Sequence, residues 1–198
     1  MSNPVTTSRG DVTRERLVEV ATALFGSRGY EGTSIEAVLK DAGVSRGSLY
    51  HHFPSKKAIL SGVLALGIED IVEDAYAVLA AGIPDPRETL EQLLQSHCRN
   101  FDRKLPHVKV FLLEARSLDR PERRKYLERR REYEKIIIDV IHEGQEQGVF
   151  RAGDPTILAY GLLGMFNWMV QWYDPNRGTS AEQIGQALVE AALGAVRP

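Results

Sequence analysis

The polar side chains between residues 45 and 51 carry the clearest chemical signal in the chain. They are a guanidinium, an imidazole, a phenol and two hydroxyls, on Arg46, His51, Tyr50, Ser45 and Ser48. On a helix that begins after Ser45, these groups lie on or beside the face opposite Leu49 and Phe53. Gly47 lies among them, although glycine costs about 1 kcal/mol relative to alanine inside a helix. Taken alone it would more often be a tolerated surface residue. In this company it indicates close approach of the helix to the major groove of DNA.

A short helix and a tight turn come before this polar face. Thr33 is the predicted N-cap, with Glu36 at the third helical position of a capping box. An apolar stripe follows at helical spacing, formed by Ile35, Val38, Leu39 and Ala42. Gly43 ends the helix because it adopts the left-handed conformation without strain. Val44 fills the corner and Ser45 caps the next helix. The sequence therefore predicts a helix-turn-helix.

Two lysines occupy the first turn of the helix that follows. Lys56 and Lys57 stand where the positive end of the helix dipole disfavours cations, by roughly 0.3 to 1 kcal/mol each. They are well placed if a DNA phosphate docks at that helix start. A solvated lysine pair is the equally weighted alternative.

The run from Thr13 to Leu64, with LFGSRGYEGTSIEAVLKDAGVSRGSLYHHFPSKKAIL at its centre, resembles the DNA-binding domain of TetR-type regulators. The resemblance implies phosphate contacts by Thr33, Ser34 and Lys56. It implies contacts to base edges or nearby phosphates by Ser45, Arg46, Ser48 and His51, around Gly47. Arg46 is the best candidate for a two-bond contact with guanine. Tyr50 would clamp the DNA backbone or lie half in the core. Lys57 departs from the family, which often has an acidic residue there.

Composition places the chain among ordinary globular proteins. Of its 198 residues 43% are hydrophobic and 26% are charged. Residues 1–60 carry a net charge of +2 and the remainder −4. Because residues 1–60 are only weakly basic, we expect two copies of this segment, one from each chain of a dimer, to bind DNA together. The binding should depend strongly on salt concentration. The single cysteine, Cys98, fits a reducing cytoplasm. We expect no membrane span and no secretion signal.

Beyond residue 55 the pattern is helix after helix. The predicted fold is all-α with about nine helices: a three-helix head in residues 1–55, of which 1–11 are a flexible arm, and a ligand-binding and dimerisation bundle in residues 56–198. A fourth helix, Ser55 to Ala81, is predicted to link the two. We expect separate fifth and sixth helices, the fifth striped from Leu90 to Phe101 and the sixth running from Leu105 to Leu118. A seventh follows Pro121 and ends at Gly148.

The last two helices are the predicted dimer surface. Residues 157–173 are apolar almost all round and so need cover on every side. The final helix starts with a capping box at Ser180 and has a flat face of small residues. Two such helices and their symmetry mates form a four-helix interface, as in TetR-type proteins. The expected interface residues are Trp172, Ile184, Leu188, Ala191 and Ala195. A purely internal core is the alternative.

Polar residues within the apolar body helices are the best indicators of an effector site. They are His97, Glu114 and Asn167, and the aromatic residues expected beside them are Phe101, Phe111, Phe166 and Trp168. For each residue alone, a satisfied place in the core is the more common role. Residues 107–178, with VFLLEARSL and LLGMFNWMVQWYDPNRG, are similar to regulators of fatty-acid and sterol side-chain breakdown that respond to acyl-CoA thioesters. The basic run from Arg120 to Arg131 is a solvated helix face or a contact for CoA phosphates.

These patterns predict a dimeric repressor that leaves a palindromic double-stranded DNA operator when a small hydrophobic effector binds. An acyl-CoA is the first candidate effector, and a different hydrophobic ligand that controls an efflux or catabolic operon is the alternative. If the protein is instead an activator, its effect on transcription is reversed. An enzyme is disfavoured, because His97 beside Cys98 lacks an evident acid partner and no metal or cofactor motif appears. A ligand carrier without DNA binding is the remaining rival.

Overall fold

The computed structural model describes residues 9–198, with the side chains of all of these except 9, 11, 100–105 and 175. This part of the chain is helical and contains no strand. Its α-helices are α1 (Arg9–Arg28), α2 (Ile35–Ala42), α3 (Arg46–His52), α4 (Lys56–Ala80), α5 (Pro86–Leu113), α6 (Arg120–Glu146), α7 (Pro155–Trp172) and α8 (Ala181–Ala195), and two short 3-10 helices are η1 (Ala115–Ser117) and η2 (Pro175–Arg177). The predicted all-α fold is confirmed. None of these helices has the length and apolar character needed to cross a bilayer.

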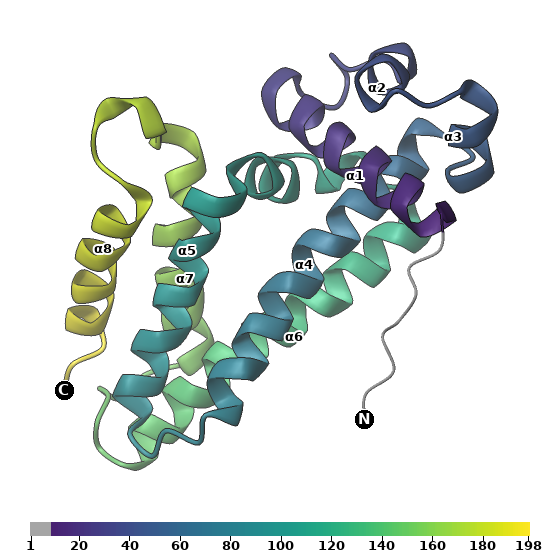
Figure 1. Cartoon of the computed structure of the whole chain (residues 1–198). Coiled ribbons are helices and arrows are strands. Elements are labelled where there is room, and N and C mark those ends of the chain that lie inside the picture. Colours follow the sequence, from purple (N-terminus) through teal and green to yellow (C-terminus); the bar gives the residue numbers. More distant parts are fainter. Residues whose placement is uncertain (1–8) are drawn as a thin grey trace, which may run out of the picture.

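The helices form a small head and a larger body. Figure 1 shows α1, α2 and α3 gathered at one end, while α4 leaves this head and runs diagonally beside α6 through the body. Helices α5 and α7 lie beside this pair, and α8 forms the edge of the body far from α3 (Figure 1). Helices α3 and α8 therefore lie on opposite sides of the molecule.

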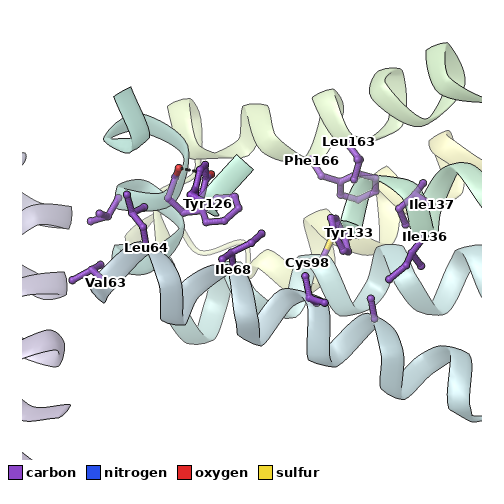
Figure 2. Packing of buried hydrophobic residues seen from close by; sticks show 14 of the residues in the cluster. Val63, Leu64, Ile68, Cys98, Tyr126, Tyr133, Ile136, Ile137, Leu163 and Phe166 are labelled. Atoms are coloured by element: carbon purple, nitrogen blue, oxygen red, sulfur yellow. Dashed lines mark hydrogen bonds between the residues drawn. The ribbon is translucent and has the colours of Figure 1, made fainter. Parts of the chain in front are cut away.

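One hydrophobic core connects the head with the body. It includes Leu17 and Phe25 of α1, Leu49 of α3 and Ile59 of α4, all almost completely buried. Farther along the same core, Tyr133 of α6 lies close to Phe166 of α7 (Figure 2). Helix α4 contributes buried side chains to this core along most of its length, from Ile59 to Ala75.

The predicted boundary between a fifth and a sixth helix is wrong. A single helix, α5, runs from Pro86 to Leu113 with Pro106 inside it. A proline removes one backbone hydrogen bond but does not have to end a helix. At Pro106 α5 also meets α1 very closely, since a Cβ added to Gly26 would lie 2.7 Å from the Cα of Pro106.

Most predicted helix ends are confirmed. Gly29 and Gly43 follow α1 and α2 with positive φ angles of 75° and 69°, as left-handed C-terminal residues. The N-caps are Ser45 for α3, Ser55 for α4 and Asp154 for α7. The capping box of Ser180 and Gln183 is present at the start of α8.

Candidate DNA-binding surface

Helix α3 presents a small, open and polar outer face. Its inner side is fixed by Leu49 and by the following Phe53, which are both buried. On the outer side, a Cβ added to Gly47 would meet no atom within 4 Å. Arg46 and His51 beside it are exposed. The sequence-predicted face is therefore free for another surface to approach.

The N-cap residue of α3 is already engaged within the helix. The hydroxyl of Ser45 accepts a hydrogen bond of 3.2 Å from the backbone N–H of Ser48. This bond satisfies one of the free backbone donors at the start of the helix. Tyr50 is 42% exposed, so part of its side chain is covered and part lies on the surface, which is compatible with both roles expected for it.

Arg46 is held by an acidic residue of α2. Its Nη2 atom donates a hydrogen bond of 2.6 Å to Oε1 of Glu36. Hydrogen bonds from the backbone N–H of Glu36, then from Arg46, lower the pKa of the Glu36 carboxyl below its usual value. Arg46 was predicted from its place on the helix, but its partner Glu36, ten residues away across the turn, was not. The first-turn position of Glu36 was instead attributed to a capping box.

The predicted cap and phosphate contact of Thr33 are wrong. Thr33 is 2% exposed, and its hydroxyl donates to the backbone carbonyls of Leu24 and Gly29 at the end of α1. Ser34 is the N-cap of α2, where its side chain accepts a hydrogen bond of 3.1 Å from Ala37. A pattern alone cannot distinguish two adjacent hydroxyl residues, and tertiary contacts with α1 decide between them.

The two lysines at the start of α4 have different partners. The Nζ atom of Lys56 lies 4.2 Å from the centre of the Tyr30 ring, which allows a cation–π contact. Lys57 donates a hydrogen bond of 2.7 Å to Asp119, just before α6, and this bond raises the pKa of Lys57. Lys57 therefore connects the head to the body.

Two further hydrogen bonds join the same parts of the molecule. The backbone N–H of Tyr30 donates to Oε1 of Glu114 at 3.0 Å. The hydroxyl of Ser61 donates to Oε2 of Glu122 at 2.7 Å. A crevice of about 410 Å³ lies beside the Ser61 and Lys57 bonds, lined by residues of α1, α3, α4 and the start of α6. These polar bonds lie next to open space and add to the hydrophobic core that the head shares with the body.

Several predicted effector residues meet inside the body. His97, Phe111 and Asn167 line one cavity of about 20 Å³, together with Tyr133 and Glu134, which the sequence analysis missed. This volume holds about one water molecule. Burial lowers the pKa of His97 to about 4, so the ring is neutral at pH 7, and its Nδ1 lies 3.0 Å from the Tyr133 hydroxyl. The ring of Phe166 packs against the His97 ring, with their centres 6.0 Å apart.

Two predicted effector residues lie elsewhere. Trp168 is 65% exposed on α7, so its expected place inside the body is wrong, because it lies on the outer face of that helix. Glu114 binds Tyr30 of the head and does not line the cavity around His97. The side chain of Phe101 lies outside the described residues.

The outer side of α7 and α8 combines large apolar and very small residues. On α7, Ile157, Trp168 and Trp172 are exposed, with Gly161 and Gly164 between them, and no atom lies within 4 Å of a Cβ added to either glycine. On α8, Ala191 and Ala195 are exposed, while Ile184 and Leu188 are partly buried. A large apolar surface on a monomer is typical of a protein–protein contact.

Comparison with known proteins agrees with this arrangement. Residues 17–63 match the family model of bacterial regulatory proteins of the tetR family, and residues 84–196 match the tetracyclin repressor-like C-terminal domain. The HTH-type transcriptional repressor KstR2 of Mycobacterium tuberculosis is 31% identical over 185 residues, which are 92% of this chain and 92% of KstR2.

Solved structures give the same result. The ketosteroid regulator KstR2 of M. tuberculosis aligns with a TM-score of 0.85 and 27% identity over 93% of this chain and 95% of that one. PfmR of Thermus thermophilus aligns with a TM-score of 0.85 and 32% identity over 90% and 97%. AibR, solved with isovaleryl coenzyme A and operator DNA, aligns with a TM-score of 0.82 and 25% identity over 94% and 98%. The chain therefore belongs to the TetR family of DNA-binding transcriptional regulators and is not an enzyme.

Proposed function

We propose that the protein is a dimeric repressor that binds a palindromic operator through α3 and leaves it when an acyl-CoA thioester binds to the body. The observation that carries this proposal is the open face around Gly47, with Arg46 and His51 exposed beside it. Arg46 is the residue we assign to a guanine, because its planar guanidinium can donate two parallel bonds to O6 and N7. Tyr50 and Ser34 are assigned to phosphates of the DNA backbone.

The proposed dimer contact is the exposed face of α7 with the small residues of α8. Gly161 and Gly164 allow a helix of a second copy to approach closely, and Trp168 and Trp172 supply apolar area on both sides of that approach. Because such a contact is two-fold symmetric, it places the two α3 helices about 34 to 36 Å apart or at a multiple of that spacing. Two weakly basic heads then bind one duplex together.

The proposed effector site includes His97 and Asn167. Because the cavity beside them has room for about one water molecule, an effector that reaches these groups must displace the surrounding side chains. Those side chains include Ile71 of α4, the helix that continues into the head. Effector binding is thus coupled to the position of α3. A coupling of about 1 to 3 kcal/mol lowers operator affinity roughly 5- to 150-fold.

An acyl-CoA is supported as the effector class by the resemblance of residues 107–178 and by the isovaleryl coenzyme A bound to AibR. The basic run of α6 gives less support. Arg129 pairs with Glu69 and Glu132, and Arg130 pairs with Glu134. These arginines act mainly on neighbouring carboxylates of the protein and not on a CoA phosphate. A different hydrophobic effector is the second candidate.

The test has two stages. A binding-site selection with purified protein identifies the operator, and fluorescence anisotropy then measures the affinity of the wild type and of Arg46→Ala for it. We expect Arg46→Ala to lose about 1 to 3 kcal/mol of operator affinity, which is 5- to 150-fold. Acyl-CoAs of increasing chain length are then titrated into the wild-type complex. Release at one range of chain lengths supports the effector class. Unchanged affinity at all lengths rejects it, and failure of the selection to enrich any sequence rejects the DNA-binding proposal itself.

A further inference from the structure

The carboxylate of Glu36 lies on the surface that we propose to face DNA. It belongs to the first turn of α2, and its side chain is 64% exposed. It accepts the 2.6 Å hydrogen bond from Arg46, and its ionised form is also favoured by its own backbone N–H and by the hydroxyl of Ser34. An acidic group in this place is unexpected on a surface that has to approach phosphates.

The donors that Glu36 collects are those that a phosphate would use. A DNA phosphate at the start of α2 would bind free backbone N–H groups, a hydroxyl and a guanidinium. Glu36 accepts the 2.6 Å bond from one of these groups, the guanidinium of Arg46, and its own backbone N–H and the Ser34 hydroxyl favour the ionised form of its carboxyl. In chemical terms its carboxylate stands in for a phosphate oxygen.

This arrangement affects correct and incorrect DNA differently. Phosphates are the same in every sequence, so a carboxylate that competes for Arg46 weakens binding to all DNA. A guanine at the correct position offers Arg46 two acceptors in one plane, which a wrong base does not. The exchange in which Arg46 leaves Glu36 and binds DNA is therefore more favourable on the operator than on other sequences.

We propose that Glu36 is a specificity-determining residue, which competes with DNA phosphates for Arg46 and so lowers the affinity of the protein for DNA outside its operator. This inference rests on the proposed DNA-binding function of α3. In this proposal Glu36 contacts no base and acts only by positioning Arg46.

The decisive measurement is the affinity of Glu36→Gln for a scrambled duplex, by fluorescence anisotropy at several salt concentrations. Glutamine keeps the shape and one carbonyl acceptor but loses the negative charge. We expect the scrambled duplex to bind at least about threefold more tightly. The log–log salt slope should become steeper by about 0.9, the value for one additional phosphate contact. Operator affinity should rise less, so that the ratio of operator to scrambled affinity falls.

Two comparison proteins separate this role from a general change of charge. Asp41→Asn removes one negative charge from the same helix, at an exposed position away from Arg46. The double variant Glu36→Gln/Arg46→Ala is compared with Arg46→Ala alone, on the scrambled duplex at low salt, where binding remains measurable. We expect the gain from Glu36→Gln in the Arg46→Ala background to be no larger than the gain from Asp41→Asn in the wild type.

Each result decides the question. A gain of equal size with and without Arg46 would mean that Glu36 only repels phosphates, and this overturns the inference. The absence of any gain in affinity from Glu36→Gln in otherwise wild-type protein would also overturn the inference. If the wild type binds no selected operator, the proposed function is overturned as well. The titration of the wild type alone distinguishes this outcome from the two outcomes above.

Discussion

The backbone N–H of Tyr30 in the head donates a 3.0 Å hydrogen bond to the carboxylate of Glu114 in the body. Tyr30 lies at the start of the turn between α1 and α2, while Glu114 follows α5 at the junction with η1. The two residues are 84 positions apart in the sequence. The end of α5 is therefore tied directly to the turn that precedes α2, by a contact between body and head that does not pass through α4.

Replacing Glu114 with alanine is expected to weaken this contact. The Tyr30 N–H loses a charged acceptor in a partly buried place, and such bonds contribute about 1.5 to 3 kcal/mol. In a chain of this size each kcal/mol lowers the melting temperature by roughly 2 to 4 °C. Glu114→Gln keeps a carbonyl acceptor and should lose much less. Calorimetry of both variants provides the test, and equal melting temperatures for alanine and glutamine would show that the hydrogen bond contributes nothing.

Replacing Gly47 with alanine should separate stability from DNA binding. No atom lies within 4 Å of the added Cβ, and alanine favours a helix by up to about 1 kcal/mol over glycine, so the melting temperature should stay the same or rise. Operator affinity should nevertheless fall at least about tenfold, equivalent to 1.4 kcal/mol, if the backbone of α3 approaches the bases closely. Unchanged operator affinity would mean that the glycine is only a tolerated surface residue.

The contrast between Gly47 and Thr33 shows what the sequence can predict. The cap residues, left-handed glycines and apolar stripes of α2 and α3 are local signals, and they predicted the helix-turn-helix correctly. The burial of Thr33 depends on backbone carbonyls of α1 that meet it only after folding. The same holds for the partners of Lys57 and Arg46, which are Asp119 just before α6 and Glu36 of α2.

In the body, too, the local patterns were predicted correctly and the contacts between distant segments were not. The apolar periodicity predicted helices throughout, but it divided α5 into two helices, one striped from Leu90 to Phe101 and one starting at Leu105. The position of Trp168 was also wrong, because a helix that is apolar all round gives no indication of which face meets its own core. Glu134 was missed because it lies in a charged run, although the residue is 8% exposed.

Replacing Gly26 with alanine is expected to destabilise the contact between head and body. The added Cβ would lie 2.7 Å from the Cα and 2.9 Å from the carbonyl oxygen of Pro106, and backbone atoms cannot move away as a flexible side chain can. Overpacking of this kind costs about 1 to 3 kcal/mol. The neighbouring Ser27→Ala, on an exposed position, should change stability by no more than about 0.5 kcal/mol. Urea unfolding of the two variants measures the difference, and equal midpoints would contradict the close packing of α1 on α5.

His97 gives a specific dependence of stability on pH. Burial lowers its pKa from the usual 6.5 to about 4, so in this pH range the unfolded chain binds a proton that the folded chain does not. The free energy of unfolding should therefore fall as the pH drops from 6.5 towards 4, by up to about 1.4 kcal/mol per pH unit from this residue.

Urea unfolding at several pH values between 4 and 7.5 tests this slope. His97→Gln removes the titrating group and should flatten the curve in this window, although it also lowers stability at neutral pH. His142→Gln is the matched control, because it makes the same substitution at an exposed histidine. A slope that His97→Gln leaves unchanged would assign the pH dependence to other groups.

Replacing Trp168 with aspartate is expected to separate the proposed dimer. In a single chain this side chain is 65% exposed, so the new carboxylate stays in water and the fold should be retained. In a dimer built on the outer face of α7, the new carboxylate would be buried against a second copy without a partner. Loss of a central tryptophan also costs at least about 2 kcal/mol, or 30-fold in affinity.

Leu79→Asp, at a 38% exposed position on α4, makes the same kind of change outside this face. Light scattering after size exclusion should find Trp168→Asp as a monomer with native helix content and Leu79→Asp as a dimer. Because each head alone is weakly basic, Trp168→Asp should also lose operator binding, and a Trp168→Asp protein that remains dimeric would place the two-fold contact on another surface.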